Sequence, residues 1–119
     1  MKKTICGIVF SSLLTIGSAS ATDLYNNGDP GYCRIIKPSQ VLDLEMDKMR
    51  SEIEFRFEHS VDVANSEQWV NSSRPVYTWA SETKVACGKA IGYLKRGHVE
   101  EDYVNKCDCF YDRMRWFMN

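Results

Sequence analysis

The sequence predicts a small, exported, all-α domain of three helices, in which the last two form a C-terminal hairpin and two disulfide bonds staple the fold. Apolar side chains recur at helical spacings of three and four residues in three stretches, and turn-forming residues separate these stretches. A leader with two lysines and then an uncharged apolar run opens the chain, and four cysteines follow it. An even number of cysteines in a short exported chain is typical of a disulfide-stapled domain.

The first 21 residues have the form of a signal peptide. Lys2 and Lys3 give a basic start, residues 4–17 are uncharged and mostly apolar, and residues 19–21 are the small-x-small pattern that signal peptidases cleave. The apolar run is shorter than the roughly 20 residues of a membrane-spanning helix. We therefore expect a signal that is removed near Ala21, no transmembrane anchor, and a bacterial protein that is periplasmic or secreted.

The remaining chain has the size and charge of one soluble domain. Cleavage near Ala21 would leave 98 of the 119 residues, with 13 of the 15 basic side chains and all 16 acidic ones, a net charge of about −3. This length suits a single hydrophobic core. The two signs of charge are interleaved and form no basic surface, so we expect no nucleic-acid partner.

Residues 22–38 should form an extended N-terminal arm ahead of a helical domain at 39–119. The arm contains the turn-forming pairs Asn-Gly and Asp-Pro between residues 27 and 30, which disfavour regular structure. We expect a bridge at Cys33 to hold it against the helical domain.

The first helix should begin at Pro38 and Ser39, with Ser39 as its cap, and run to about His59. Residues 52–58 also alternate between apolar and charged side chains, as in a half-buried strand. A longer apolar stripe favours the helix, because its members follow at spacings of 4, 3, 4 and 4: Leu42, Met46, Met49, Ile53 and Phe57.

A polar loop with at most a short helical turn should fill residues 60–74. The second helix would then begin near Pro75, with Ser73 or Ser81 as a cap. Gly97 in a left-handed conformation should end it, after two basic residues that suit a helix C-terminus. Its inner positions are expected to be Trp79, Cys87, Ala90, Ile91 and Leu94.

The third helix has the most regular pattern in the chain. Acidic residues at 100–102 suit its N-terminus. The apolar stripe then follows at spacings of 4, 3, 4 and 3: Tyr103, Cys107, Phe110, Met114 and Phe117.

The cysteine spacing predicts the disulfide pairing. Cys87 and Cys107 lie ten residues on either side of Gly97, so two antiparallel helices would place them at the same level. Two positions along a helix turn by about 200°, so Cys109 faces away from Cys107 and needs another partner. We expect Cys87–Cys107 and Cys33–Cys109, although the sequence alone leaves three pairings open.

The cysteines also permit an alternative function, a thiol–disulfide or metal-handling factor that uses Cys107 and Cys109. Three cysteines with His59 or His98 would supply four zinc ligands, but their spacing matches no familiar zinc finger. Two methionine pairs at helical spacing are soft ligands for copper, but no histidine joins either pair. An oxidising compartment favours structural bridges, so we expect no metal and no cofactor.

No catalytic motif is present in the sequence. There is no Gly-x-Ser-x-Gly, and the serines near histidine have no recognisable triad context. His59 and His98 should be surface residues beside Glu58 and Glu100, rather than catalytic bases. We therefore expect a non-enzyme.

The C-terminal segment favours protein binding. Arg113, Arg115 and Trp116 are residue types enriched at interface centres, and three helices cannot easily bury three tryptophans and six tyrosines. We expect these three residues to contact another envelope or secreted protein. The chain would then be an accessory subunit of an envelope or secretion/conjugation assembly, or an immunity-type inhibitor.

Overall fold

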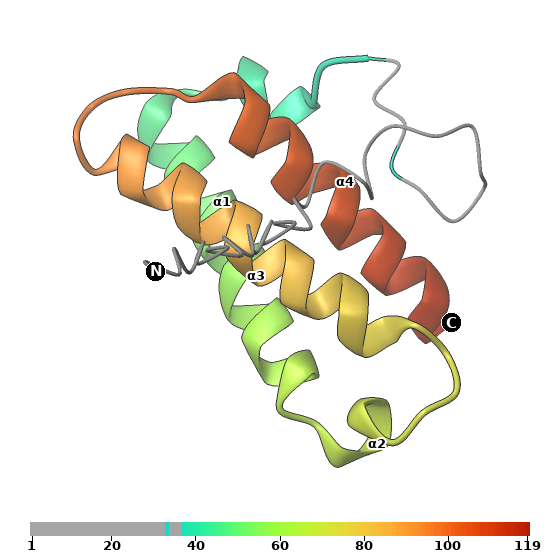
Figure 1. The fold of residues 1–119 in the computed structure, drawn as a ribbon. Helices are drawn as coiled ribbons and strands as arrows, with labels where there is room; N and C mark the ends of the chain where they lie inside the picture. The colour runs from blue at the N-terminus through green and yellow to red at the C-terminus, as the bar shows by residue number, and fades with distance from the viewer. Residues whose placement is uncertain (1–32, 34–36) are drawn as a thin grey trace, which may run out of the picture.

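Helices make up all the regular secondary structure of the residues that the computed structural model describes, Cys33 and 37–119. The predicted signal peptide at 1–21 and most of the predicted arm at 22–38 lie outside these residues. No helix within them is long and apolar enough to cross a membrane. The elements, shown in Figure 1, are the 3-10 helix η2 (Gln40–Asp43), α1 (Met46–Ala64), the short α2 (Glu67–Val70), α3 (Val76–Leu94) and α4 (Glu101–Met118).

Helix α3 is the central element of the fold. It packs extensively against α4 on one side and α1 on the other, while α1 and α4 share a much smaller contact (Figure 1). Small side chains on α3 let its neighbours approach closely, and a Cβ at Gly88 would lie 3.3 Å from the Phe57 ring of α1. The all-α fold with a C-terminal hairpin is confirmed. The largest apolar side chains that are almost completely buried, with less than 2% of their surface exposed, are Phe110, Ile53, Met114, Val76 and Val104.

The start of the first helix differs from the prediction. Ser39 caps the 3-10 turn η2, because its hydroxyl oxygen accepts a hydrogen bond of 3.1 Å from the Val41 amide. Leu44 is then extended, and α1 begins only at Met46. Met46 is consequently 42% exposed, instead of lying on the inner face.

The rest of α1 is longer than expected. Residues 52–58 are helical, with Ile53 buried and Phe55 exposed, so the strand alternative is wrong. The helix continues to Ala64, whereas the sequence predicts that a loop begins at residue 60. Ser60 is compatible with this buried helical position, because its hydroxyl donates to the carbonyl of Phe57 at 2.7 Å.

The ends of α3 are explained by local geometry. Neither predicted serine caps its N-terminus, where Pro75 precedes the first turn. At the other end Gly97 has φ of +74°, as predicted. The Gly97 amide donates to Leu94 and the His98 amide donates to Tyr93, at 2.9 and 3.1 Å. This pair of bonds is a Schellman motif, and it fixes the turn that leads into α4.

Candidate functional site

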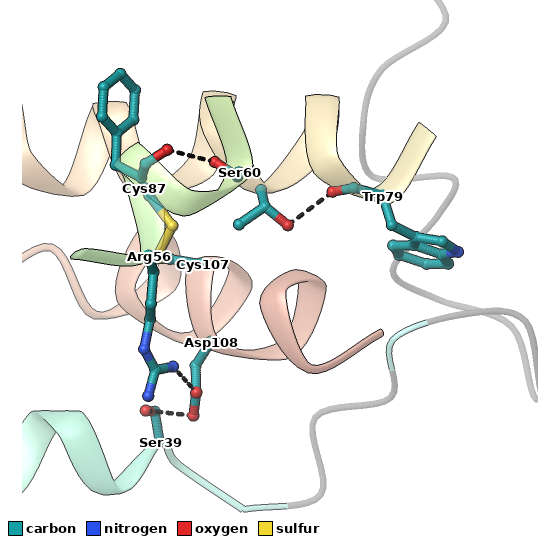
Figure 2. The surroundings of a disulfide bond; sticks show 9 residues. Ser39, Arg56, Ser60, Trp79, Cys87, Cys107 and Asp108 are labelled. Carbon is teal, nitrogen blue, oxygen red and sulfur yellow. Dashed lines mark hydrogen bonds and ion pairs between the residues drawn. A yellow bond between two sulfur atoms is a disulfide. The ribbon is translucent and has the colours of Figure 1, made fainter. Parts of the chain in front are cut away.

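Two disulfide bonds fix the helices that carry the candidate site. Cys87 and Cys107 join α3 to α4 in the core, with both residues buried and their Cα atoms 4.7 Å apart (Figure 2). Cys33 is joined to Cys109 on α4, with a Cα–Cα distance of 5.8 Å. These are the pairs expected from the spacing. Neither sulfur of the Cys-Asp-Cys segment is therefore a free thiol in this structure.

A polar cluster lies where α1, α4 and the start of the helical domain meet. Arg56 on α1 forms an ion pair with Oδ1 of Asp108, and the Ser39 hydroxyl donates to Oδ2 of the same carboxylate at 2.6 Å (Figure 2). The Ser39 amide donates to Oδ1 of Asn105 at 2.8 Å. Asp108 is the residue between the two bridged cysteines of α4. The cluster therefore fastens Ser39 to α4 beside the Cys33–Cys109 bridge.

No pattern in the sequence predicted this cluster. Ser39 and Asp108 are separated by 69 positions, and Arg56 and Asp108 by 52. The one available signal is the helical rotation of about 100° per residue, which places Asp108 beside the buried face that Cys107 marks. The helical rotation does not identify which residue of another segment contacts Asp108.

His59 and Tyr111 form a second polar contact between α1 and α4. His59 Nδ1 lies 2.8 Å from the Tyr111 hydroxyl, and the rings meet edge-on at 5.6 Å. Burial raises the pKa of the Tyr111 phenol, against the opposing effect of Arg115 and Arg56. The phenol is thus a neutral hydrogen-bonding group that joins the helices, not an activated base.

The two histidines have different environments. His59 lies at the surface beside Glu58, as expected, but it is half-buried because its ring packs against Tyr111. His98 is exposed, and its Nε2 lies 3.3 Å from Glu100, as expected. No group of three or more His, Cys, Asp or Glu side chains within the described part of the chain is arranged to hold a metal ion.

The C-terminal patch, defined as Arg113, Arg115 and Trp116, lies on the last turns of α4. Trp116 is 64% exposed, and its ring meets Phe117 edge-on at 4.8 Å. The Arg113 guanidinium lies 6.0 Å from the centre of the Trp116 ring. Arg115 is directed instead toward the Tyr111 ring, 5.8 Å from its centre. The structure therefore brings Arg113 and Trp116 together and places Arg115 at the edge of the patch.

A further cation, Arg74, borders the patch and was not predicted. Its Nη1 donates to the carbonyls of Phe117 and Met118, at 3.4 and 3.5 Å. These carbonyls belong to the last turn of α4, which has no intrahelical donors for them. Arg74 thus supports the end of the helix that presents Trp116.

Comparison with known proteins gives no match: no protein-family model, no curated protein and no solved structure is similar to this chain. The function is therefore inferred from the geometry of the chain itself.

Proposed function

We propose that this protein is a non-enzymatic periplasmic protein that binds another envelope or secreted protein through its C-terminal patch. The observation that carries the proposal is Trp116, which is 64% exposed, has the Arg113 guanidinium near its ring and meets Phe117 edge-on, all on a disulfide-held helix. Tryptophan and arginine are the residues most enriched in binding hot spots.

The support beneath Trp116 favours binding over chance exposure. Helix α4 is joined to α3 at Cys107 and to the start of the domain at Cys109, and Arg74 caps its last turn. A helix held in this way loses little conformational freedom when a partner docks, which lowers the entropic cost of association. The two bridges also support an extracytoplasmic location, because disulfides persist in oxidising compartments.

The class of partner follows from this setting. A small binding domain with an exposed tryptophan on a fixed helix suits an accessory subunit of an envelope or secretion/conjugation assembly, or an immunity-type inhibitor of a secreted enzyme. In either case Trp116 enters a pocket of the partner, and Arg113 pairs with an acidic group at its rim.

Site-specific photocrosslinking in cells tests the proposal. A photoreactive amino acid at position 116 should give one discrete crosslinked product, and the captured protein is then purified. Trp116→Ala should lower the affinity for the captured protein at least 10-fold, which corresponds to a loss of about 1.4 kcal/mol of binding free energy. Phe55 on α1 is a matched control, because it is an aromatic residue that is 59% exposed.

Two results would contradict the proposal. Equal crosslinking from positions 55 and 116 would show that capture does not depend on the patch. Unchanged affinity in both Trp116→Ala and the Trp116→Ala, Arg113→Ala double variant would exclude the patch as the binding surface.

The alternative function is thiol–disulfide exchange or metal handling at Cys107 and Cys109. It predicts free thiols or bound metal in the native mature protein, and alkylation of the thiols and elemental analysis test these two predictions separately.

A further inference from the structure

The opposite end of the α3–α4 hairpin carries a second candidate site, here called the tyrosine hollow. It has a volume of about 280 Å³ and is lined by Lys89, Gly92, Tyr93, Arg96 and Tyr103. The rings of Tyr93 and Tyr103 lie nearly parallel, at 18°, with centres 5.9 Å apart. The Schellman motif at Gly97 fixes the turn between these two tyrosines.

The hollow is positively charged, although the whole chain is slightly acidic. Lys89 Nζ lies 5.2 Å from the centre of the Tyr103 ring, and Arg96 is exposed at the rim. Nearby, Lys106 is neutralised by Asp102, 2.7 Å away. By contrast, no carboxylate of the described residues forms an ion pair with Lys89 or Arg96. Two uncompensated cations therefore face solvent beside an aromatic surface.

Gly92 provides independent evidence that the hollow is kept open. A Cβ at this position would meet nothing within 4 Å, whereas a Cβ at Gly88, one turn earlier on α3, would press on Phe57. Glycine inside a helix costs about 1 kcal/mol relative to alanine. Packing explains that cost at Gly88 but not at Gly92. A bare backbone is useful where a bound group must approach the helix closely.

We infer that the tyrosine hollow binds an acidic segment of a partner protein. A carboxylate side chain of that segment would lie over Gly92 and pair with Lys89 and Arg96, while its neighbouring residues would contact Tyr93 and Tyr103. This inference rests on the proposed function, since it names a second element that the partner must present. Along α4 the hollow is about 20 Å from Trp116, given 1.5 Å of rise per residue.

The chemistry of the hollow favours a peptide over a small molecule. Sites for small molecules usually bury at least about 70% of the ligand surface. Here Tyr93 and Arg96 are exposed, and the hollow lies open at the surface of two helices. Tyrosine and arginine around a shallow depression are instead typical of contact with a larger partner.

Titration of the isotopically labelled mature protein with a synthetic glutamate–glycine peptide tests the inference by NMR. The peptide should shift the amide signals of Lys89, Gly92 and Arg96, and a glutamine–glycine peptide should not. Lys89→Glu with Arg96→Glu should weaken binding at least 10-fold. Lys48→Glu with Lys84→Glu makes the same change in net charge at exposed positions elsewhere, and it should have less than a twofold effect.

Gly92→Leu provides a variant that fills the hollow without endangering the fold, because leucine is the better helix former. It should abolish peptide binding while raising thermal stability. The inference is overturned if the control charge variant weakens binding as much, if Gly92→Leu still binds, or if inorganic phosphate shifts the same signals as strongly as the peptide. Trp116→Ala should leave peptide binding unchanged, so failure at the hollow and failure at the C-terminal patch are distinguishable.

Discussion

The two disulfide bonds differ in what they hold together. The Cys87–Cys107 bridge joins two rigid helices within the core and spans 20 positions, whereas Cys33–Cys109 spans 76 and attaches the chain ahead of η2. From loop-closure entropy alone, Cys87–Cys107 should stabilise the fold by about 3 kcal/mol and Cys33–Cys109, which closes the longer loop, by about 4.5 kcal/mol. Packing ranks them the other way, since both cysteines of the first bridge are buried between α3 and α4.

Loop length is a poor guide to the stabilisation by a disulfide when one of the joined segments can detach from the fold. If Cys33–Cys109 is lost, the segment before Ser39 can detach while the helices stay folded. Removing the bridge then raises the conformational entropy of this segment in the folded state as well as in the unfolded state. This gain offsets much of the stabilisation that loop closure alone predicts for the bridge. If Cys87–Cys107 is lost, no part of α3 or α4 can detach without opening the core. The buried bridge should therefore contribute more to global stability.

The largest effect is expected from removing the buried bridge. Cys87→Ala with Cys107→Ala should lower the free energy of unfolding by at least about 3 kcal/mol, because loop closure and core packing are both lost. For a domain of this size that corresponds to a fall in Tm of at least about 12 °C. Thermal melts followed by circular dichroism measure it. A smaller loss than in the Cys33→Ala, Cys109→Ala variant would reverse the ranking.

A smaller effect is expected from the ion pair that supports the other bridge. Arg56→Met should cost about 2 kcal/mol, below the 3–5 kcal/mol of a fully buried pair, because both side chains retain some exposure. Urea unfolding measures this cost, and a double-mutant cycle with Asp108→Asn isolates the coupling. A coupling energy near zero would show that the contact adds nothing to stability.

Removing the Cys33–Cys109 bridge should act locally. Cys33→Ala with Cys109→Ala should lower global stability by about 1 kcal/mol, within the low part of the range for disulfides. Amide exchange at Ser39 and Val41 should accelerate at least 10-fold, while exchange in the middle of α3 should change little. Equal acceleration at both places would mean that the segment and the helices unfold as one unit.

The smallest effect concerns Asp112, next to the Asp108 cluster. Although this residue is exposed overall, desolvation of its carboxyl raises its pKa above 3.8, and the Asp108 carboxylate adds to the rise. The folded state therefore favours the protonated form, so this group's contribution to stability falls as pH rises from below 3.8 through the folded pKa. Asp112→Asn should raise stability at pH 7 by less than about 0.5 kcal/mol, since exposed charges are screened. Chemical unfolding of both proteins at pH 3 and pH 7 checks the sign, and a gain at pH 3 alone would contradict it.

Features that depend on neighbours within a few residues could be predicted from the sequence. The periodic stripe predicted α4, with Cys107, Phe110 and Met114 buried, and Gly97 ends α3 in the left-handed conformation. The same helical geometry, applied on both sides of Gly97, predicted the disulfide pairing. Rotation and rise per residue are properties of the backbone, so they follow from spacing alone.

Only the tertiary structure decided which polar and exposed groups meet. Asp108 accepts a hydrogen bond from Ser39, 69 positions away, and this contact holds the residue that caps η2 against α4. The Tyr111 hydroxyl likewise draws His59 into the interface between two helices. Helix packing also places Tyr93 of α3 against Tyr103 of α4. Such contacts depend on how each helix is rotated against its neighbour, and the apolar pattern fixes that rotation only to within the width of a face.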